Sequence, residues 1–233
     1  MRRAFLLLKL TAIAATSRST RVFYDRVSPF YELLFTDHLP HVQAMASAVS
    51  ERFHGDHHVK VLDMACGTGA LSRRLGERGF CVTGLDFSLK SLDLLNQATR
   101  NIPLIQADAA ALPLASSSFD VVTCMGAWRH FPEPQRVVDE VRRVLRPNGI
   151  FLVGYFPPRL AGIFSAPSGP LGRAVAVFYG RIMRLLNYND RTGQELEREI
   201  LRMIDVAFEK YHLIRSHELE YLIFAESPRY NLG

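Results

Sequence analysis

The chain of 233 residues is long enough for one domain, and a chain of this length buries roughly 70–75% of its unfolded surface without help from disulfides or metals. Its composition, 48% hydrophobic and 22% charged, excludes a largely disordered protein. The net charge of +5 is concentrated in residues 1–24, which carry five basic and no acidic residues. The remaining chain is balanced in charge, so a basic face that binds nucleic acid is not expected.

No metal site is predicted. The three cysteines form no CxxC pair, which is typical of reduced thiols in a reducing compartment. Three histidines and an aspartate gather in residues 54–58, ahead of the first predicted strand. A short solvated loop explains this group better than a metal site does.

Residues 1–20 form an arginine-bearing and largely apolar segment. Its apolar part, residues 4–16, is shorter than the ~20 residues that a membrane-spanning helix needs. We expect an amphipathic helix that either packs on the domain or rests on an anionic membrane surface. A cleaved signal peptide and an organelle transit peptide are the alternatives. The expected location is the cytoplasm, with or without peripheral membrane contact.

From residue 59 onward, short apolar runs alternate with helical patterns. Strands are predicted at residues 59–64, 80–86, 102–106, 119–124 and 150–155. Helices are predicted after Gly69, over residues 89–98 behind a Ser88 N-cap, and from Pro134 to a turn at Asn148-Gly149. Strands that alternate with helices at this spacing imply an α/β fold, in which helices cover both faces of a parallel sheet.

Residues 157–191 interrupt this alternation. The first half of the segment is rich in proline and glycine, and the second half is an apolar helical pattern with arginines. We therefore predict a cap insertion over one end of the sheet. A helix over residues 195–208 and a closing antiparallel pair of strands at 211–216 and 220–225 follow it.

The most specific feature is the segment Val61-Leu62-Asp63-Met64-Ala65-Cys66-Gly67-Thr68-Gly69-Ala70, a glycine turn between a strand and a helix. Such a turn lets the backbone approach a ligand closely. A dinucleotide site is not favoured, because Ser72 stands where the third glycine of that fingerprint belongs. A phosphate-binding loop is excluded, because no Gly-Lys-Ser/Thr follows.

The segment resembles the first motif of class I S-adenosylmethionine-dependent methyltransferases, an acidic residue followed by three alternating glycines. Asp63 matches the acid, Gly67 and Gly69 match two glycines, and Ala65 replaces the first. The resemblance implies a Rossmann-like fold with a seven-stranded, mostly parallel sheet. It also implies S-adenosylmethionine as the cofactor, with these four residues at its binding site.

Further motifs of the family follow in order. By the resemblance, Asp86 at the end of the second strand accepts both ribose hydroxyls, and Phe87 packs on the adenine. Asp108, with Ala109 beside it, lies where the family binds the adenine amino group. The resemblance covers residues 59–226, which we take as the methyltransferase domain, preceded by a helical lid segment over 1–58 and followed by a tail at 227–233.

The segment from Phe23 to Leu34 resembles the Tyr-Asp-x-x-Ala-x-x-Tyr-Asp sequence of the ubiquinone/menaquinone methyltransferase group and its phospholipid-methylating relatives. Ser28 stands for the alanine and Glu32 for the second aspartate. In that group the segment folds over the cofactor, which would bring Tyr31 near the methionine moiety. An amphipathic helix that only packs on the domain is the alternative.

Residues 125–132 resemble the Phe-Gly-Leu-Arg-Asn stretch of the quinone methyltransferases. Arg129 matches, and His130 replaces the asparagine. Met125 is assigned to the cofactor site. A phenolic or enolic acceptor must lose a proton, for which His130 is suited, and Arg129 would hold the resulting oxyanion. A solvated loop histidine is the alternative.

The sequence therefore predicts an enzyme that methylates carbon or oxygen of a small lipophilic acceptor, with a quinone-type or phenolic ring favoured. A phosphatidylethanolamine-type lipid N-methyltransferase is the alternative enzyme. A non-catalytic protein that binds S-adenosylmethionine is the alternative of a different class. No nucleic-acid partner is expected, and the sequence does not indicate an oligomeric state.

Overall fold

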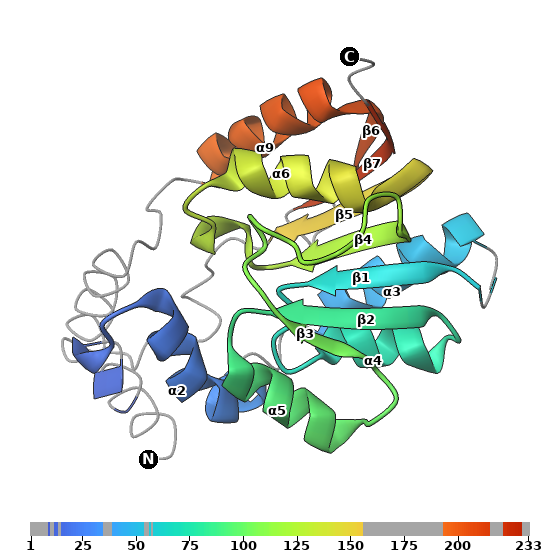
Figure 1. Ribbon diagram of the computed structural model, residues 1–233. Helices are drawn as coiled ribbons and strands as arrows, with labels where there is room; N and C mark the ends of the chain where they lie inside the picture. Colours follow the sequence, from blue (N-terminus) through green and yellow to red (C-terminus); the bar gives the residue numbers. More distant parts are fainter. Residues whose placement is uncertain are drawn as a thin grey trace.

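The computed structural model describes residues 9, 12–13, 15–34, 39–53, 56, 58–155, 193–214 and 221–229. The predicted cap insertion at 157–191 lies outside these residues. The described chain is built on a seven-stranded sheet with the order β3-β2-β1-β4-β5-β7-β6 (Figure 1). The strands are β1 (Lys60–Met64), β2 (Cys81–Asp86), β3 (Leu104–Gln106), β4 (Phe119–Met125), β5 (Leu145–Tyr155), β6 (Phe208–Ile214) and β7 (Tyr221–Pro228).

The first five strands are parallel and β7 is antiparallel to both of its neighbours. This confirms the predicted α/β class, the strand number and the closing antiparallel pair. The helices are α2 (Thr20–Leu34), α3 (Leu39–Phe53), α4 (Ala70–Glu77), α5 (Leu89–Ala98), α6 (Pro134–Val144) and α9 (Gly193–Ala207), with a short 3-10 helix η2 (Trp128–His130).

Two hydrophobic clusters cover the two faces of the sheet. Adjacent residues of β4 point to opposite faces, so Val121 packs with α3 and α4 while Val122 packs with α6 and α9. Phe151 and Leu152 on β5 divide in the same way. The central strands are therefore buried on both sides, which is why they read as continuous apolar runs.

The start of β5 differs from the prediction. Leu145 pairs with Phe119, and the ladder then shifts register before Ile150 pairs with Val121. The residues between form a bulge in which Asn148 has a φ of +65°, so the predicted Asn148-Gly149 turn lies inside the strand rather than before it. At the other end of the chain, β7 continues to Pro228, two residues beyond the predicted end of the domain at 226.

Among the residues that the structure describes, no helix is long and apolar enough to cross a membrane. Part of the N-terminal segment contacts α2, since the ammonium group of Lys9 lies 4.2 Å from the centre of the Phe30 ring. This contact agrees with the packing form of the prediction, and contact with a membrane surface stays a prediction.

Candidate functional site

The glycine turn after β1 has a backbone that favours glycine at three positions. Ala65, Gly67 and Gly69 have φ angles of +55°, +55° and +83°. Ala65 stands where the resembled motif has its first glycine, and a left-handed conformation costs a non-glycine residue roughly 1–2 kcal/mol. The turn is fixed by backbone hydrogen bonds from Cys66 N–H to Leu85 O at 3.0 Å and from Gly69 N–H to Cys66 O at 2.9 Å.

The two glycines face different surroundings. A Cβ atom at Gly69 would lie 2.2 Å from Cδ1 of Leu95, so Gly69 lets the start of α4 pack against α5. A Cβ atom at Gly67 would meet nothing within 4 Å. The backbone at Gly67 therefore borders open space, as the approach of a ligand to this turn requires.

Asp86, at the end of β2, joins this turn to the next loop. Its Oδ2 accepts a hydrogen bond from Gly67 N–H at 2.8 Å, and its Oδ1 accepts one from Ser88 N–H at 2.9 Å. The side chain is buried, which raises the pKa of the carboxyl, while the backbone N–H groups of Ser88, Gly67 and Phe87 act in the opposite direction. A carboxylate has about four acceptor positions, so Asp86 keeps capacity to accept a ribose hydroxyl beside these backbone donors.

Asp63 lies deeper than a direct cofactor contact requires. It is 1% exposed, and its carboxylate accepts hydrogen bonds from Ser72 Oγ at 2.5 Å and from Thr123 Oγ1 at 2.9 Å. Burial raises the pKa of Asp63 to about 6. In the structure, Asp63 therefore links β1 to α4 and β4 beneath the turn. Its contact with the cofactor stays a prediction.

The residues predicted for the adenine side lie in the loops after β2 and β3. Phe87 follows Asp86, and its carbonyl accepts a hydrogen bond from Gln106 Nε2 at 3.2 Å, which ties the two loops together. Asp108 is exposed and accepts a hydrogen bond from Ala110 N–H at 2.9 Å. Ala109 is buried in the hydrophobic core. The structure places these residues at the carboxyl ends of the strands, as it does Asp86.

The segment after β4 supplies the predicted acceptor side. Met125 ends β4 and is half-buried, and Trp128–His130 form η2, in which Arg129 is buried and His130 is partly buried. The ring nitrogen Nε2 of His130 lies 2.6 Å from the hydroxyl oxygen of Tyr24. Burial, with the charge of Arg129 as a second cause, lowers the pKa of His130 to about 4. The imidazole is therefore neutral at neutral pH.

Helix α2 brings residues to the site that the sequence analysis did not select. The predicted contact was Tyr31, which lies on α2 but whose side chain is outside the described residues. Tyr24, seven positions earlier, contacts both the predicted adenine side, through the Phe87 ring at 5.9 Å between centroids, and His130. The resembled Tyr-Asp pair at Tyr24 and Asp25 contained the signal, since it marks the first tyrosine as well as the second.

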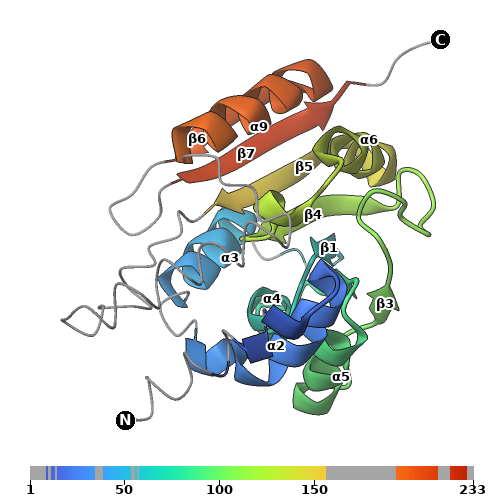
Figure 2. The ribbon, with the colours of Figure 1, turned by 90° about the vertical axis from the view of Figure 1, so that its left-hand side faces the viewer.

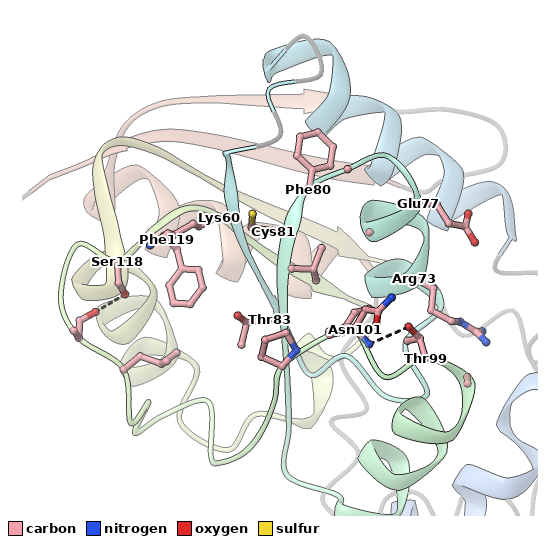
Figure 3. A pocket seen from close by; sticks show the side chains of 18 residues that line it. Lys60, Arg73, Glu77, Phe80, Cys81, Thr83, Thr99, Asn101, Ser118 and Phe119 are labelled. Atoms are coloured by element: carbon pink, nitrogen blue, oxygen red, sulfur yellow. Dashed lines mark hydrogen bonds between the residues drawn. The ribbon is translucent and has the colours of Figure 1, made fainter.

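A hollow of about 980 Å³ lies at the opposite end of the sheet (Figure 3). The residues that line it include the first residue of β1, of β2 and of β4, which are Lys60, Cys81 and Phe119. The residues that line it include none of those predicted for the cofactor. We therefore place the candidate site at the carboxyl ends of the strands, where ligands of open parallel sheets bind.

Comparison with known proteins agrees with this geometry. Residues 62–153 match a family model described as a methyltransferase domain. Demethylmenaquinone methyltransferases of Renibacterium salmoninarum and Thermus thermophilus are 39% and 33% identical over 105 and 133 residues. These matches cover 45% and 54% of this chain, and 44% and 57% of the relatives, so the chain spans about half the length of the relatives it matches.

Solved structures extend the likeness over more of the chain. A protein of Methanococcus maripaludis assigned as an S-adenosylmethionine-dependent methyltransferase matches 91% of this chain and 95% of its own, with a TM-score of 0.64 at 18% identity. A methyltransferase of Methanosarcina mazei matches 74% of this chain and 93% of its own, with a TM-score of 0.51 and 18% identity. At such identities the match describes the fold alone.

Residues 62–153 thus match a methyltransferase domain, and the fold around them is the one shared by class I S-adenosylmethionine-dependent methyltransferases, whose cofactor is S-adenosylmethionine. Within the class, the sequence is similar to the quinone methyltransferase group. The predicted fold and family resemblance are confirmed. The roles of the individual site residues stay predictions.

Proposed function

We propose that this protein transfers the methyl group of S-adenosylmethionine to a small lipophilic acceptor with a quinone-type or phenolic ring. The observation that carries the proposal is that Gly67, Asp86 and His130 lie at or just beyond the carboxyl ends of β1, β2 and β4, three neighbouring strands of the sheet. The names of the relatives, which methylate a demethylmenaquinone, support the choice of acceptor.

The residues present fit the cofactor. Asp86 keeps acceptor capacity for the ribose hydroxyls, and the open space at Gly67 lets the ligand lie against the backbone. Phe87 offers an aromatic face for the adenine ring. When bound, the cofactor supplies a methyl group made reactive by the positive charge on its sulfur.

On the acceptor side, His130 and Arg129 have complementary properties. In the tautomer whose Nε2–H donates to Tyr24, the other ring nitrogen of the neutral His130 imidazole can accept a proton from a phenolic or enolic acceptor. The guanidinium of Arg129 already lowers the pKa of its neighbour through its charge. The same charge would stabilise an oxyanion next to it, because the surroundings are buried and little water screens the interaction.

The test is incubation of the purified protein with S-adenosylmethionine labelled on the methyl group, first with a reduced naphthoquinone and then with a membrane lipid extract. We expect label on carbon or oxygen of the quinol. Label on the amine of a phospholipid would support lipid N-methylation instead. Tight binding of the cofactor with no transfer to either acceptor would support the non-catalytic alternative and contradict the proposal.

A matched variant tests the role of His130. His130→Ala should lower kcat by ~10²–10⁴-fold on a quinol acceptor, because it removes the group that accepts the proton. Affinity for the cofactor should change far less. A variant within threefold of the wild-type kcat would overturn the role of His130 as a base.

A further inference from the structure

Helix α2 is attached to two loops that lie on opposite sides of the glycine turn. In the sheet, β1 lies between β2 and β4. Tyr24 of α2 bonds to His130 after β4, and Asp25 of α2 bonds to Ser88 after β2. Adjacent residues of one helix therefore span the end of β1. Figure 2, which views the molecule from the side at which the parallel strands end, shows α2 in front of β1 and beside α5.

The attachment through Tyr24 is specific in geometry. The oxygen of the phenol lies 2.6 Å from Nε2 of His130, and the two rings meet edge to face with centroids 5.1 Å apart. The Tyr24 ring also contacts Phe23 on its own helix, at 5.3 Å, and Phe87 in the loop after β2. Tyr24 is thus positioned by aromatic contacts on both sides of the site.

Asp25 is linked through one residue, Ser88, to Asp86, the residue predicted to bind the ribose. Oδ1 of Asp25 accepts a hydrogen bond from Ser88 Oγ at 2.6 Å, and the N–H of Ser88 donates to Asp86. One helical turn further on, the hydroxyls of Ser28 and Ser91 are 2.6 Å apart in a buried contact between α2 and α5. The side of α2 next to α5 is therefore held by hydrogen bonds to Ser88 and Ser91, while its other side meets η2 through the hydrogen bond and the ring contact between Tyr24 and His130.

We propose that Tyr24 is a positioning residue that latches α2 to η2 through His130, so that a cofactor bound at Gly67 and Asp86 leaves only after this hydrogen bond opens. The inference rests on the proposed function, because that function places the cofactor beneath α2. The latch ends on the imidazole proposed to accept the proton. The same hydrogen bond therefore contributes both to the closure of α2 and to the orientation of His130.

The test is the rate at which S-adenosylhomocysteine dissociates from the full-length protein, measured by stopped flow. Tyr24→Phe keeps the ring and removes the hydroxyl, and should raise the dissociation rate about three- to tenfold, as expected for one hydrogen bond. His130→Ala should raise it to a similar extent. The double variant should be no faster than the faster single variant, because both changes remove the same bond.

Tyr211→Phe is the matched control, since it makes the same chemical change on the exposed strand β6 and should leave the rate unchanged. Unchanged rates in Tyr24→Phe and His130→Ala, or effects that simply multiply in the double variant, would overturn the latch. A loss of global stability that accounts for the faster release would overturn it as well, so the free energy of unfolding is measured alongside.

Hydrogen exchange separates this inference from the proposed function. If the wild-type protein fails to bind S-adenosylhomocysteine, the proposed function fails, and the latch is judged by the amide exchange of residues 20–30. Faster exchange there in Tyr24→Phe, but not in Tyr211→Phe, supports the latch. Equal exchange in both variants contradicts it.

Discussion

The carboxylate of Asp86 both shapes the site and is proposed to bind the ribose. An Asp86→Asn substitution keeps the size of the side chain and replaces one acceptor oxygen by a donor group. One of the two backbone N–H groups from Gly67 and Ser88 then loses its acceptor, and so does one ribose hydroxyl. Because each loss of this kind costs about 1–3 kcal/mol, affinity for S-adenosylmethionine should fall by roughly ten- to hundredfold.

Isothermal titration calorimetry measures this change, with Asp120→Asn as the control. Asp120 also accepts a hydrogen bond from a backbone N–H, that of Lys60 at 2.9 Å, but it lies at the opposite end of the sheet. Its substitution should leave the affinity for S-adenosylmethionine unchanged. Equal affinities in Asp86→Asn and the wild type would remove Asp86 from the binding site.

At this scale the sequence predicted the residues of the turn but not their partners. Gly67 and Asp86 could be selected because a strand, a glycine turn and a second acid at a fixed spacing bring them to one edge of a parallel sheet. The contact of Tyr24 with His130 joins residues 106 positions apart, and no periodicity encodes such a pair. Its two residues could be marked by resemblance, but only the structure shows which tyrosine of the segment reaches the histidine.

At the scale of elements, the two glycines before α4 have different roles: Gly69 is expected to matter mainly for stability and Gly67 mainly for cofactor binding. Gly69→Ala should lower the free energy of unfolding by about 2–4 kcal/mol, because it adds left-handed strain and a collision with Leu95. Gly67→Ala meets open space and carries the strain alone, so its cost in stability should be smaller. Its methyl group points into the space proposed for the cofactor, so its main effect should be weaker binding.

Urea denaturation and calorimetric titration on the same two variants check this expectation. We expect the two measurements to rank the variants in opposite order. Gly69→Ala should have the lower free energy of unfolding, and Gly67→Ala should have the lower affinity for S-adenosylmethionine. The same ranking in both measurements would contradict the separation.

The elements themselves show where sequence patterns suffice. The predicted helix over 89–98 agrees residue for residue with α5, because Ser88 accepts a hydrogen bond from Ser91 N–H and fixes the first turn. The prediction for β5 began five residues late. Its first residue, Leu145, belongs by periodicity to the preceding helix, and its pairing with Phe119 is set by a distant strand.

For the whole molecule, two buried groups make stability depend on pH in opposite directions. The pKa of His130 is lowered from 6.5 to about 4, so between these values the unfolded state binds more protons and acid destabilises the fold. The pKa of Asp63 is raised from 3.8 to about 6, so the folded state binds more protons there, and stability falls as the pH rises through that range. The two effects offset each other between about pH 4 and 6.

Replacing His130 by glutamine should isolate the contribution of His130 to the pH dependence of the unfolding free energy. Relative to the variant, the wild type should lose on the order of 2–3 kcal/mol of unfolding free energy as the pH falls from about 7.5 to 4, and almost nothing above about pH 7.5. Urea denaturation across pH 4–8 measures both proteins. Parallel curves below pH 6.5 would show that the imidazole is not held neutral in the fold.

The strand order also determines which strands lie at the edges of the sheet. Among the strands that the structure describes, the two at the edges of the sheet are β3, which has three residues, and β6. An exposed edge strand invites pairing with another chain, the first step of aggregation. On β6 the consecutive side chains of Glu209, Lys210, Tyr211 and His212 are exposed, and Lys210 faces Glu226 across the ladder. An incoming strand would have to desolvate these polar and charged groups, which disfavours pairing of another chain with β6.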